Sequence, residues 1–156
     1  MQIYLNLGSN LGSRMALIGR ACAVLARRLA PARLLMSSYV ESEPWGFDSP
    51  HPFLNRGILV LTERDIHPEA VLDITQAAER EVAAYAATEF GLSPTEAAAH
   101  RNADGTYRDR PIDIDIIDIG GLAYHSPSLT LPHPRAHQRP FVLTPWQELL
   151  SAKSKN

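Results

Sequence analysis

The residues from Ile112 to Ile116 alternate apolar and acidic side chains with a period of two. On an extended strand this pattern places Asp113 and Asp115 on one face and the isoleucines on the other. The two aspartates are then roughly 6.6 Å apart along the strand, so their oxygens can converge on one or two hard cations such as Mg²⁺. Carboxylates this close repel each other unless a cation or arginines compensate them, and Arg108 and Arg110 lie just upstream. The alternative is an exposed strand face that carries two acids, but aspartate is depleted in strand interiors, so the pattern favours a metal site.

The size and composition of the chain limit what can surround this site. Its 156 residues predict one domain over residues 1–150, with a single core, and a frayed tail over residues 151–156. The lone Cys22 cannot form an internal disulfide and is typical of a buried thiol in a reducing compartment. The chain has no run of about 18 apolar residues and no leader pattern, so we expect a cytoplasmic protein without a membrane partner. A formal charge of −2 and a pI near 6.3 provide no basic field for nucleic acid, and we expect a monomer or a weak homodimer.

The hydrophobic pattern predicts helices and strands in an order that indicates the fold class. The expected elements are a strand over Ile3 to Leu7, a helix from Ser13 to about Leu29, strands over Leu34 to Glu41 and Phe53 to Thr62, a helix that begins at Pro68, a short helix over Pro94 to His100, the strand that carries the two aspartates, a hairpin arm over Leu122 to His125 after Gly120-Gly121, and a helix over Phe141 to Leu150. The order βαββαβ predicts an α+β sandwich with two helices on one face of a mostly antiparallel sheet. Glu79 falls on the inner face of the second helix, which indicates that it faces a cleft.

Several further motifs occur in an order and spacing that together are specific. They are Gly8-Ser9-Asn10-Leu11-Gly12, Glu41-Ser42-Glu43-Pro44-Trp45-Gly46, Phe53-Leu54-Asn55, the run from Arg110 to Asp115, and Leu129-Thr130-Leu131-Pro132-His133-Pro134 followed by Arg139 and Phe141. In these motifs, over nearly its whole length, the chain resembles the 6-hydroxymethyl-7,8-dihydropterin pyrophosphokinase family of folate biosynthesis. The resemblance implies a ferredoxin-like α+β fold. It also implies transfer of pyrophosphate from ATP to the hydroxymethyl group of the pterin, with release of AMP.

Pyrophosphoryl transfer depends mainly on positioning and charge neutralisation. We therefore expect Asp113 and Asp115 to hold two Mg²⁺ ions that bridge the triphosphate and the attacking hydroxyl, without a dedicated protein base. Arg110 and Arg139 are the candidates for binding phosphate oxygens, because a guanidinium donates two parallel hydrogen bonds. The alternative role, surface salt bridging, fits the other nearby arginines better.

A pterin is a flat heteroaromatic ring with an amide-like edge. We expect Phe53 and Phe141 to sandwich this ring and Asn55 to pair with its 2-amino-4-oxo edge. For each aromatic residue taken alone, ordinary core packing is the alternative. The turn at Gly8 to Gly12 would let Asn10 approach the pterin. By resemblance, the pocket is closed by Ser42, Glu43, Pro44 and Trp45, of which the tryptophan is expected to be an exposed, mobile lid.

The chain has no P-loop sequence for ATP. By resemblance, ATP would contact Leu72, Gln76, Glu79, Arg101, Tyr107, Arg110, Ile116, Thr130, His133 and Arg139. We expect His133, between two prolines, to hydrogen-bond a phosphate or the ribose, and a structural histidine in a turn is the alternative. The other histidines, His51, His67, His100, His125 and His137, show no metal-ligand spacing and are predicted to lie on the surface.

The chain departs from the family in the segment before the catalytic strand. Thr106-Tyr107-Arg108-Asp109-Arg110 stands where the family has Arg-Trp-Gly-Pro-Arg, and Val82-Ala83-Ala84-Tyr85 replaces a Gly-Arg-x-Arg after the second helix. Tyr107 can still stack, and Arg108 or Arg101 can supply the lost charge. The segment from Ala83 to Thr106 is also longer than usual, which would alter turnover, pterin choice or regulation. Two alternatives remain. One is a non-catalytic or altered-substrate pterin- or nucleotide-binding paralogue with a degenerate lid. The other is a metal-dependent phosphohydrolase or glycosyl-nucleotide enzyme, which leaves the aromatic-asparagine pocket without a role.

Overall fold

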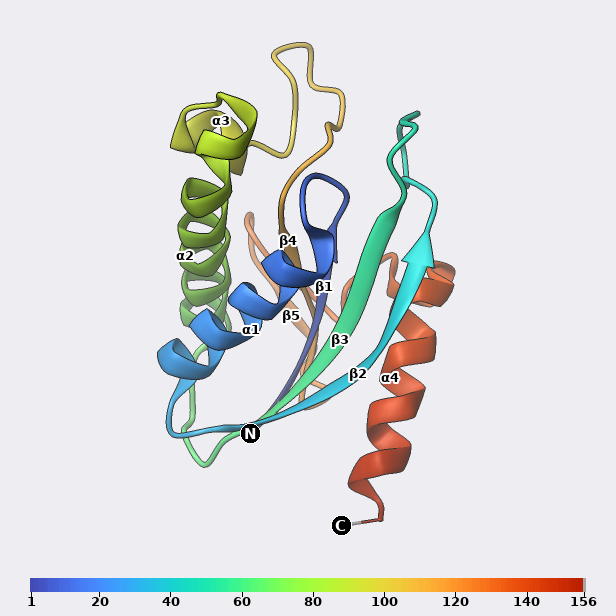
Figure 1. Cartoon of the computed structure of the whole chain (residues 1–156). Helices are drawn as coiled ribbons and strands as arrows, with labels where there is room; N and C mark the ends of the chain where they lie inside the picture. Colours follow the sequence, from blue (N-terminus) through green and yellow to red (C-terminus); the bar gives the residue numbers. More distant parts are fainter. Residues whose placement is uncertain (156) are drawn as a thin grey trace.

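Four strands form one antiparallel sheet in the computed structural model, which describes residues 1–155. The strands are β1 (Gln2–Ser9), β2 (Arg33–Ser42), β3 (Phe53–Leu61) and β4 (Asp113–Ile119), and their order in the sheet is β2-β3-β1-β4 (Figure 1). Every pairing in this sheet is antiparallel. The arrangement confirms the predicted α+β, ferredoxin-like class.

Two long helices cover one face of the sheet, as predicted. They are α1 (Arg14–Leu29) and α2 (Pro68–Ala87), and Arg27 and Arg28 at the end of α1 bind the carboxylate of Glu81 on α2. Apolar residues recur on one face of α1, so the helix buries that face against the sheet. A third helix, α4 (Pro140–Lys153), packs on the opposite face, against β2 and β3 (Figure 1).

The apolar core therefore lies in two layers, one on each face of the sheet. The larger one fills the space between α1, α2 and the sheet. The smaller one lies under α4, where the rings of Tyr4 and Trp146 stack with centroids 5.0 Å apart. The prediction of two helices on one face did not include this second layer, because α4 has too few charged residues to mark its buried side by periodicity.

Two predicted boundaries differ from the structure. Tyr124–His125 (β5) pairs with Thr130–Leu131 (β6) in a separate two-stranded sheet, and does not return along β4 as the hairpin prediction required. Hydrogen bonds from Ser126 and Ser128 to Glu69 hold this small hairpin on the start of α2. In addition, α4 continues to Lys153, so the first three residues of the predicted tail are helical. Asn156, the last residue of that tail, lies outside the described residues.

The loops that join these elements gather at one end of the sheet. Gly8 pairs with Asn55 on β3 and with Asp113 on β4, and Ser42 pairs with Phe53, so these residues share that end. The segment between α2 and β4 lies above it (Figure 1) and contains the short helices η1 (Thr88–Phe90) and α3 (Pro94–Ala98). A further short helix, η2 (Ala136–Gln138), precedes α4. None of the helices within residues 1–155 combines the length and apolar character needed to span a bilayer.

Candidate active site

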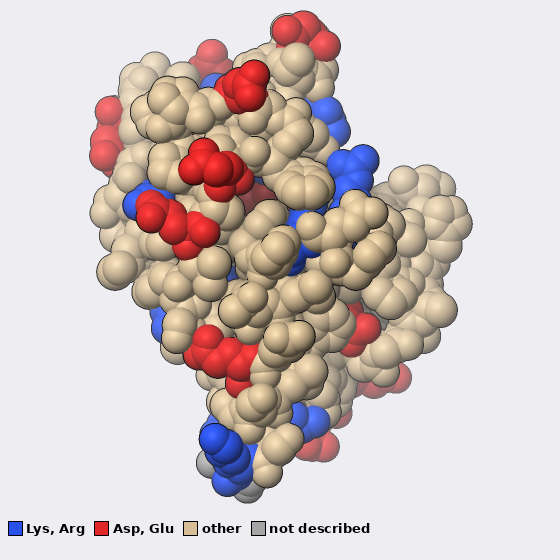
Figure 2. Space-filling model, turned by 90° about the vertical axis from the view of Figure 1, so that its right-hand side faces the viewer, with Lys and Arg blue, Asp and Glu red and all other residues tan. Residues whose placement is uncertain are grey.

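A cavity of about 460 Å³ opens at this end of the sheet. Its wall contains residues from all four strands and from the segments that follow or precede them. The lining residues are Asn6, Gly8, Ser42, Glu43, Trp45, Phe47, Phe53, Asn55, His100, Arg101, Tyr107, Arg110, Asp113, Asp115, His133, Pro134, Arg135, Arg139 and Phe141. Figure 2 shows Lys and Arg side chains in the upper half of one face, partly recessed among uncharged atoms.

Both aspartates of β4 face this cavity, each beside an arginine. Asp113 Oδ2 accepts a hydrogen bond from Arg110 Nη2 at 2.7 Å. Asp115 Oδ2 accepts one from Arg139 Nη1 at 3.4 Å. The period-two pattern of the strand therefore places the carboxylates on a common face, where charge-assisted hydrogen bonds orient them.

Asp113, Asp115 and Glu79 form an acidic cluster with too little positive charge around it. Burial, followed by the charge of Asp113, raises the pKa of Asp115 well above its usual range. Burial also raises the pKa of Glu79, again with Asp113 as the next cause. Burial alone would raise the pKa of Asp113 as well, but the attraction of Arg110 and His100 outweighs it and lowers that pKa. The cluster thus holds more carboxyl groups than its arginines can neutralise, which is the donor chemistry that divalent cations fit.

Two guanidinium nitrogens at the cavity have no hydrogen-bond partner within the described residues. They are the buried Nε atoms of Arg110 and Arg139, and the buried Oδ1 of Asn6 is unpartnered in the same way. Buried polar atoms nearly always have partners, so these unpaired atoms on residues of the cavity wall indicate a site specialised for function. Phosphate oxygens match a guanidinium in charge and shape.

Across β1 from the acids, the cavity wall is aromatic and carries an ordered carboxamide. Asn55 Nδ2 donates to the carbonyl of Val40 at 3.1 Å and to Ser42 Oγ at 2.8 Å, which leaves Oδ1 to accept from a ligand. A Cβ on Gly8 would lie 3.2 Å from Asn55 Oδ1 and 3.3 Å from the Phe53 ring, so glycine keeps this corner open.

Aromatic rings surround that corner. Phe47 meets Phe53 edge-on with centroids 6.3 Å apart. The Trp45 side chain is 42% exposed, and Arg139 lies 5.6 Å from its ring centroid. Such a surface fits one face of a flat ring.

Most of the predicted pterin residues line the cavity, and two do not. Pro44 is absent from the wall among the described residues. Asn10 is buried behind it, with Nδ2 donating to the carbonyl of His51 and to Asp109 Oδ1, and Oδ1 accepting from the backbone of Arg110. Its predicted position at the pterin is therefore corrected: the carboxamide is occupied by these bonds and joins the end of β1 to the loop before β3 and the segment before β4.

The predicted ATP residues divide in the same manner. Arg101, Tyr107, Arg110, His133 and Arg139 line the cavity, whereas Leu72, Gln76, Glu79, Ile116 and Thr130 do not within the described chain. Ile116 is buried in the larger core. The buried Glu79 carboxyl group accepts a hydrogen bond from the backbone of Ile114 at 2.7 Å and lies close to Asp113 in the acidic cluster.

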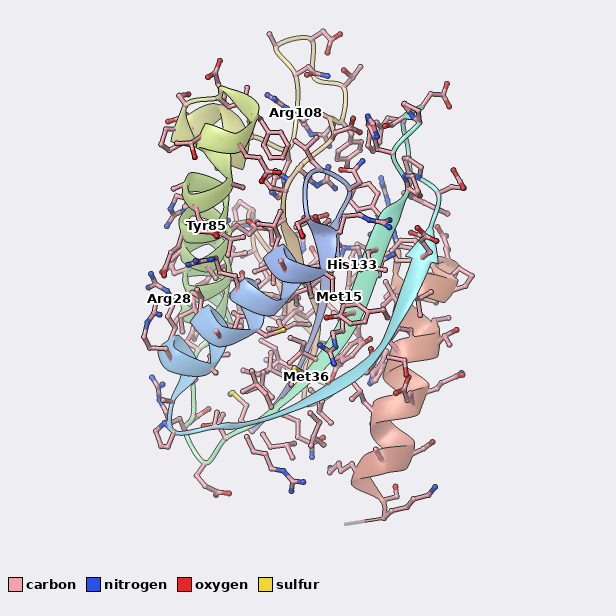
Figure 3. The ribbon with its side chains drawn as sticks, viewed as in Figure 1. Met15, Arg28, Met36, Tyr85, Arg108 and His133 are labelled. Atoms are coloured by element: carbon pink, nitrogen blue, oxygen red, sulfur yellow. The ribbon has the colours of Figure 1, made fainter. Side chains whose placement is uncertain are left out.

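The sequence interpretation missed several lining residues, and it was wrong about His100. Its imidazole is partly buried at the cavity, 3.5 Å from Glu79 and 3.7 Å from Asp113, instead of lying on the surface. Its partners come from α2 and β4, so no spacing along the chain could have indicated them. The other missed residues are Asn6, Gly8, Phe47, Pro134 and Arg135. Arg108 lies at the loop end of the molecule, and Tyr85 and Arg28 lie on the outer side of the helical layer (Figure 3).

Comparison with known proteins shows which family the chain is similar to. The family model described as 7,8-dihydro-6-hydroxymethylpterin-pyrophosphokinase matches residues 4–151. The chain is 43% identical over 149 residues to the 2-amino-4-hydroxy-6-hydroxymethyldihydropteridine pyrophosphokinase of Porphyromonas gingivalis (strain ATCC 33277), which covers 94% of this chain and 89% of the relative. The enzyme of the same name from Bacillus subtilis (strain 168) is 28% identical over 152 residues, covering 97% of this chain and 80% of the relative.

In a third relative, the similar region is part of a longer protein. The folate synthesis bifunctional protein of Chlamydia trachomatis serovar D is 32% identical over 152 residues, which cover 91% of this chain and 29% of that protein. The match to the family model spans nearly the whole chain, and the acids, arginines and aromatic residues described above lie within it. The chain therefore belongs to the 7,8-dihydro-6-hydroxymethylpterin-pyrophosphokinase family.

Proposed function

We propose that the cavity is the active site of this ATP-dependent pyrophosphokinase of folate biosynthesis. Pyrophosphate passes from ATP to the hydroxymethyl group of 6-hydroxymethyl-7,8-dihydropterin, and AMP is released. The observation that carries the proposal is that Asp113 and Asp115 line the same cavity as Phe53 and Asn55. A phosphoryl site and a site for a flat ring are thereby adjacent, which transfer between two bound substrates requires.

Asp113 and Asp115 are the residues that would hold two Mg²⁺ ions. Their carboxylates suit this hard cation, and the raised pKa of Asp115 reflects a shortage of positive charge at the site. When bound, the ions would supply neutralisation of the triphosphate and a lowered pKa of the pterin hydroxyl. The protein residues then have the task of orienting both substrates.

Arg110 and Arg139 bind the phosphate chain in this proposal. Each is nearly buried, each keeps an unpartnered Nε, and each is held by one aspartate. One hydrogen bond to a carboxylate restrains each guanidinium in advance, which limits the conformational cost of binding. His133 also lines the cavity, and burial, followed by the charge of Arg139, lowers its pKa, so it is suited to donate as a neutral imidazole.

The pterin would lie against Phe53 and Phe141 with its polar edge toward Asn55. In the transfer step, a bond forms between the hydroxymethyl oxygen and the β-phosphorus of ATP. The bond between that phosphorus and the oxygen bridging to the α-phosphate breaks, and AMP leaves with that oxygen. The hydroxyl proton passes to solvent water in the same step, so no protein base is required.

The deciding experiment measures AMP. The purified chain is incubated with ATP, Mg²⁺ and 6-hydroxymethyl-7,8-dihydropterin, and products are separated by chromatography. We expect AMP and the pterin pyrophosphate in equal amounts. Asp115→Asn should lower kcat by about 10²-fold or more, because a metal ligand contributes several kcal/mol to the transition state.

Asp118→Asn is the matched control. Asp118 lies on the same strand but does not line the cavity, and among residues 1–155 its side chain accepts a hydrogen bond only from the backbone of Gly121. It should keep the rate of the unmodified chain. Pterin binding without AMP formation would contradict the proposal in favour of the binding paralogue. Formation of ADP or free phosphate would indicate a phosphohydrolase or an ordinary kinase.

A further inference from the structure

The imidazole of His100 lies between two carboxylates that belong to different elements. Its Nε2 is 3.5 Å from Glu79 Oε1 on α2, and its Nδ1 is 3.7 Å from Asp113 Oδ1 on β4. The backbone around it is anchored, because Arg108 N–H donates to the His100 carbonyl at 3.2 Å. Upstream, Ala97 of α3 is buried against Ala83 of α2. The position of His100 is thus set by α3 before it and by the segment around Arg108 after it.

The two oxygens of Asp113 have different neighbours. Oδ2 accepts from Arg110, whereas Oδ1 faces the histidine. The gap of 3.7 Å to Nδ1 is too long for a hydrogen bond. It is suitable for one cation, since two metal–ligand bonds of about 2.1 Å can span up to about 4.2 Å. Asp113 Oδ1 and His100 Nδ1 can therefore bind the same ion.

The other ring nitrogen faces a carboxyl group, as the second nitrogen of a metal-bound histidine usually does. Histidine ligands typically donate their second N–H to a carboxylate, which fixes the tautomer and the ring orientation. Here Nε2 faces Glu79, whose Oε1 is itself held by the backbone N–H of Ile114 at 2.7 Å. A proton on Nε2 leaves the lone pair on Nδ1, on the side of Asp113.

We propose that His100 Nδ1 is a further protein ligand, together with Asp113, for one of the two cations of the reaction, and that Glu79 orients the imidazole. This inference rests on the proposed function, because it uses the cation site at Asp113. Imidazole nitrogen suits Co²⁺ and Zn²⁺ better than it suits Mg²⁺. The expected consequence is that the long segment before β4 shifts the metal preference of this enzyme toward such ions.

The test uses Mn²⁺ as a paramagnetic probe. The full chain is loaded with Mn²⁺ and methylenediphosphonate, which contains no nitrogen, and pulsed electron paramagnetic resonance measures coupling to directly bound ¹⁴N. We expect nitrogen coupling in the unmodified chain and its loss in His100→Gln, whose amide can bind a metal only through oxygen. The ratio of Co²⁺ to Mg²⁺ affinity should fall by about tenfold or more in the same variant.

Two matched variants identify the source of the nitrogen. His133→Gln removes the other histidine of the cavity, and His137→Gln removes an exposed one outside it. Both should keep the coupling. Glu79→Gln should also keep it but weaken Mn²⁺ binding, by about 10-fold to 100-fold, as loss of an orienting carboxylate does.

The outcomes separate this inference from the proposed function. Mn²⁺ that binds without nitrogen coupling, or coupling that persists in His100→Gln, overturns the role of His100 and leaves the aspartate site intact. Absence of Mn²⁺ binding, or binding that Asp115→Asn does not weaken, overturns both. Absence of nitrogen coupling in the unmodified chain overturns the role of His100 without any variant, so the inference stays testable even where a variant fails to fold.

Discussion

At the scale of single residues, Gly57 leaves the space that Tyr4 and Pro145 need in order to pack together under α4. A Cβ added to it would lie 2.5 Å from the Tyr4 hydroxyl and 2.8 Å from the Pro145 Cβ. Tyr4 cannot move easily, because it donates a hydrogen bond to the Val142 carbonyl and stacks on Trp146. Pro145 is buried within α4. We expect Gly57→Ala to lower the free energy of unfolding by about 1–3 kcal/mol, as overpacking does, measured by urea denaturation.

Gly19 provides the opposite case within the same chain. It lies in the middle of α1, is exposed, and has no atom within 4 Å of an added Cβ. Gly19→Ala should raise the free energy of unfolding by about 0.5–1 kcal/mol, because alanine restricts the unfolded chain. If both variants changed stability in the same direction, steric closure at Gly57 would not be the cause of its effect.

The same scale shows what a sequence can reveal about a site. Asp113 and Asp115 were predictable, since the period of a strand alone places them on one face and their charges then demand a partner. Asn6 and His100 were not, because their significance comes from neighbours on other elements. Asn6 is opposite Asp115 in the register of β1 and β4, and nothing in its local sequence indicates an unpaired carboxamide.

At the scale of elements, hydrophobic periodicity predicted every strand of the main sheet and its long helices to within a few residues. It failed where pairing depends on contacts outside the segment. The β5 strand pairs with β6 because Glu69 on α2 holds the turn between them, and no local pattern contains that carboxylate. The position of α4 on the opposite face likewise depends on the space that the sheet leaves uncovered.

Three segments meet at the side chain of Asp109. Its Oδ1 accepts hydrogen bonds from Asn10 Nδ2 at 2.8 Å and from Ser49 Oγ at 2.6 Å. The loop from β2 to β3, which carries Trp45 and Phe47, is thus tied to β1 and to the start of β4. Asp109→Ala should release that loop and raise the Kd for the pterin by about tenfold or more, since even one hydrogen bond to a charged group contributes about 1.5–3 kcal/mol and about 1.4 kcal/mol corresponds to tenfold. Isothermal titration in the presence of a non-hydrolysable ATP analogue measures this.

Asp104→Ala is the control for this element. Asp104 also accepts two hydrogen bonds, but both come from Thr106 within its own loop. Its removal should leave the pterin Kd within about twofold of the unmodified value, as expected for a surface substitution. Equal Kd values for the two variants would show that the connection between the loops does not contribute to binding.

At the scale of the whole molecule, the active site is a source of instability that the rest of the fold must offset. Two layers of apolar core support a cavity whose wall contains acids in excess of their local cations. Functional sites commonly reduce stability in this way, because the groups that bind a ligand are left without their best partners until it arrives. The stability of the chain should therefore respond strongly to ligands and to removal of one acid.

The loss of stability caused by the site can be measured at Asp115. Burial and the charge of Asp113 raise the pKa of this residue in spite of Arg139. A raised carboxyl pKa means that the ionised form is unfavourable in the folded state, so stability falls as the pH rises from about 4 through that pKa. At alkaline pH, without ligand, Asp115→Asn should therefore raise Tm by a few degrees, whereas Asp118→Asn should leave it unchanged.

Saturating Mg²⁺ with a non-hydrolysable ATP analogue should stabilise the unmodified chain by about 2–4 kcal/mol but the Asp115 variant by much less, so that the order of the melting temperatures reverses. A ligand-free variant that melts below the unmodified chain would show that the pairing of Asp115 with Arg139 outweighs its repulsion from Asp113.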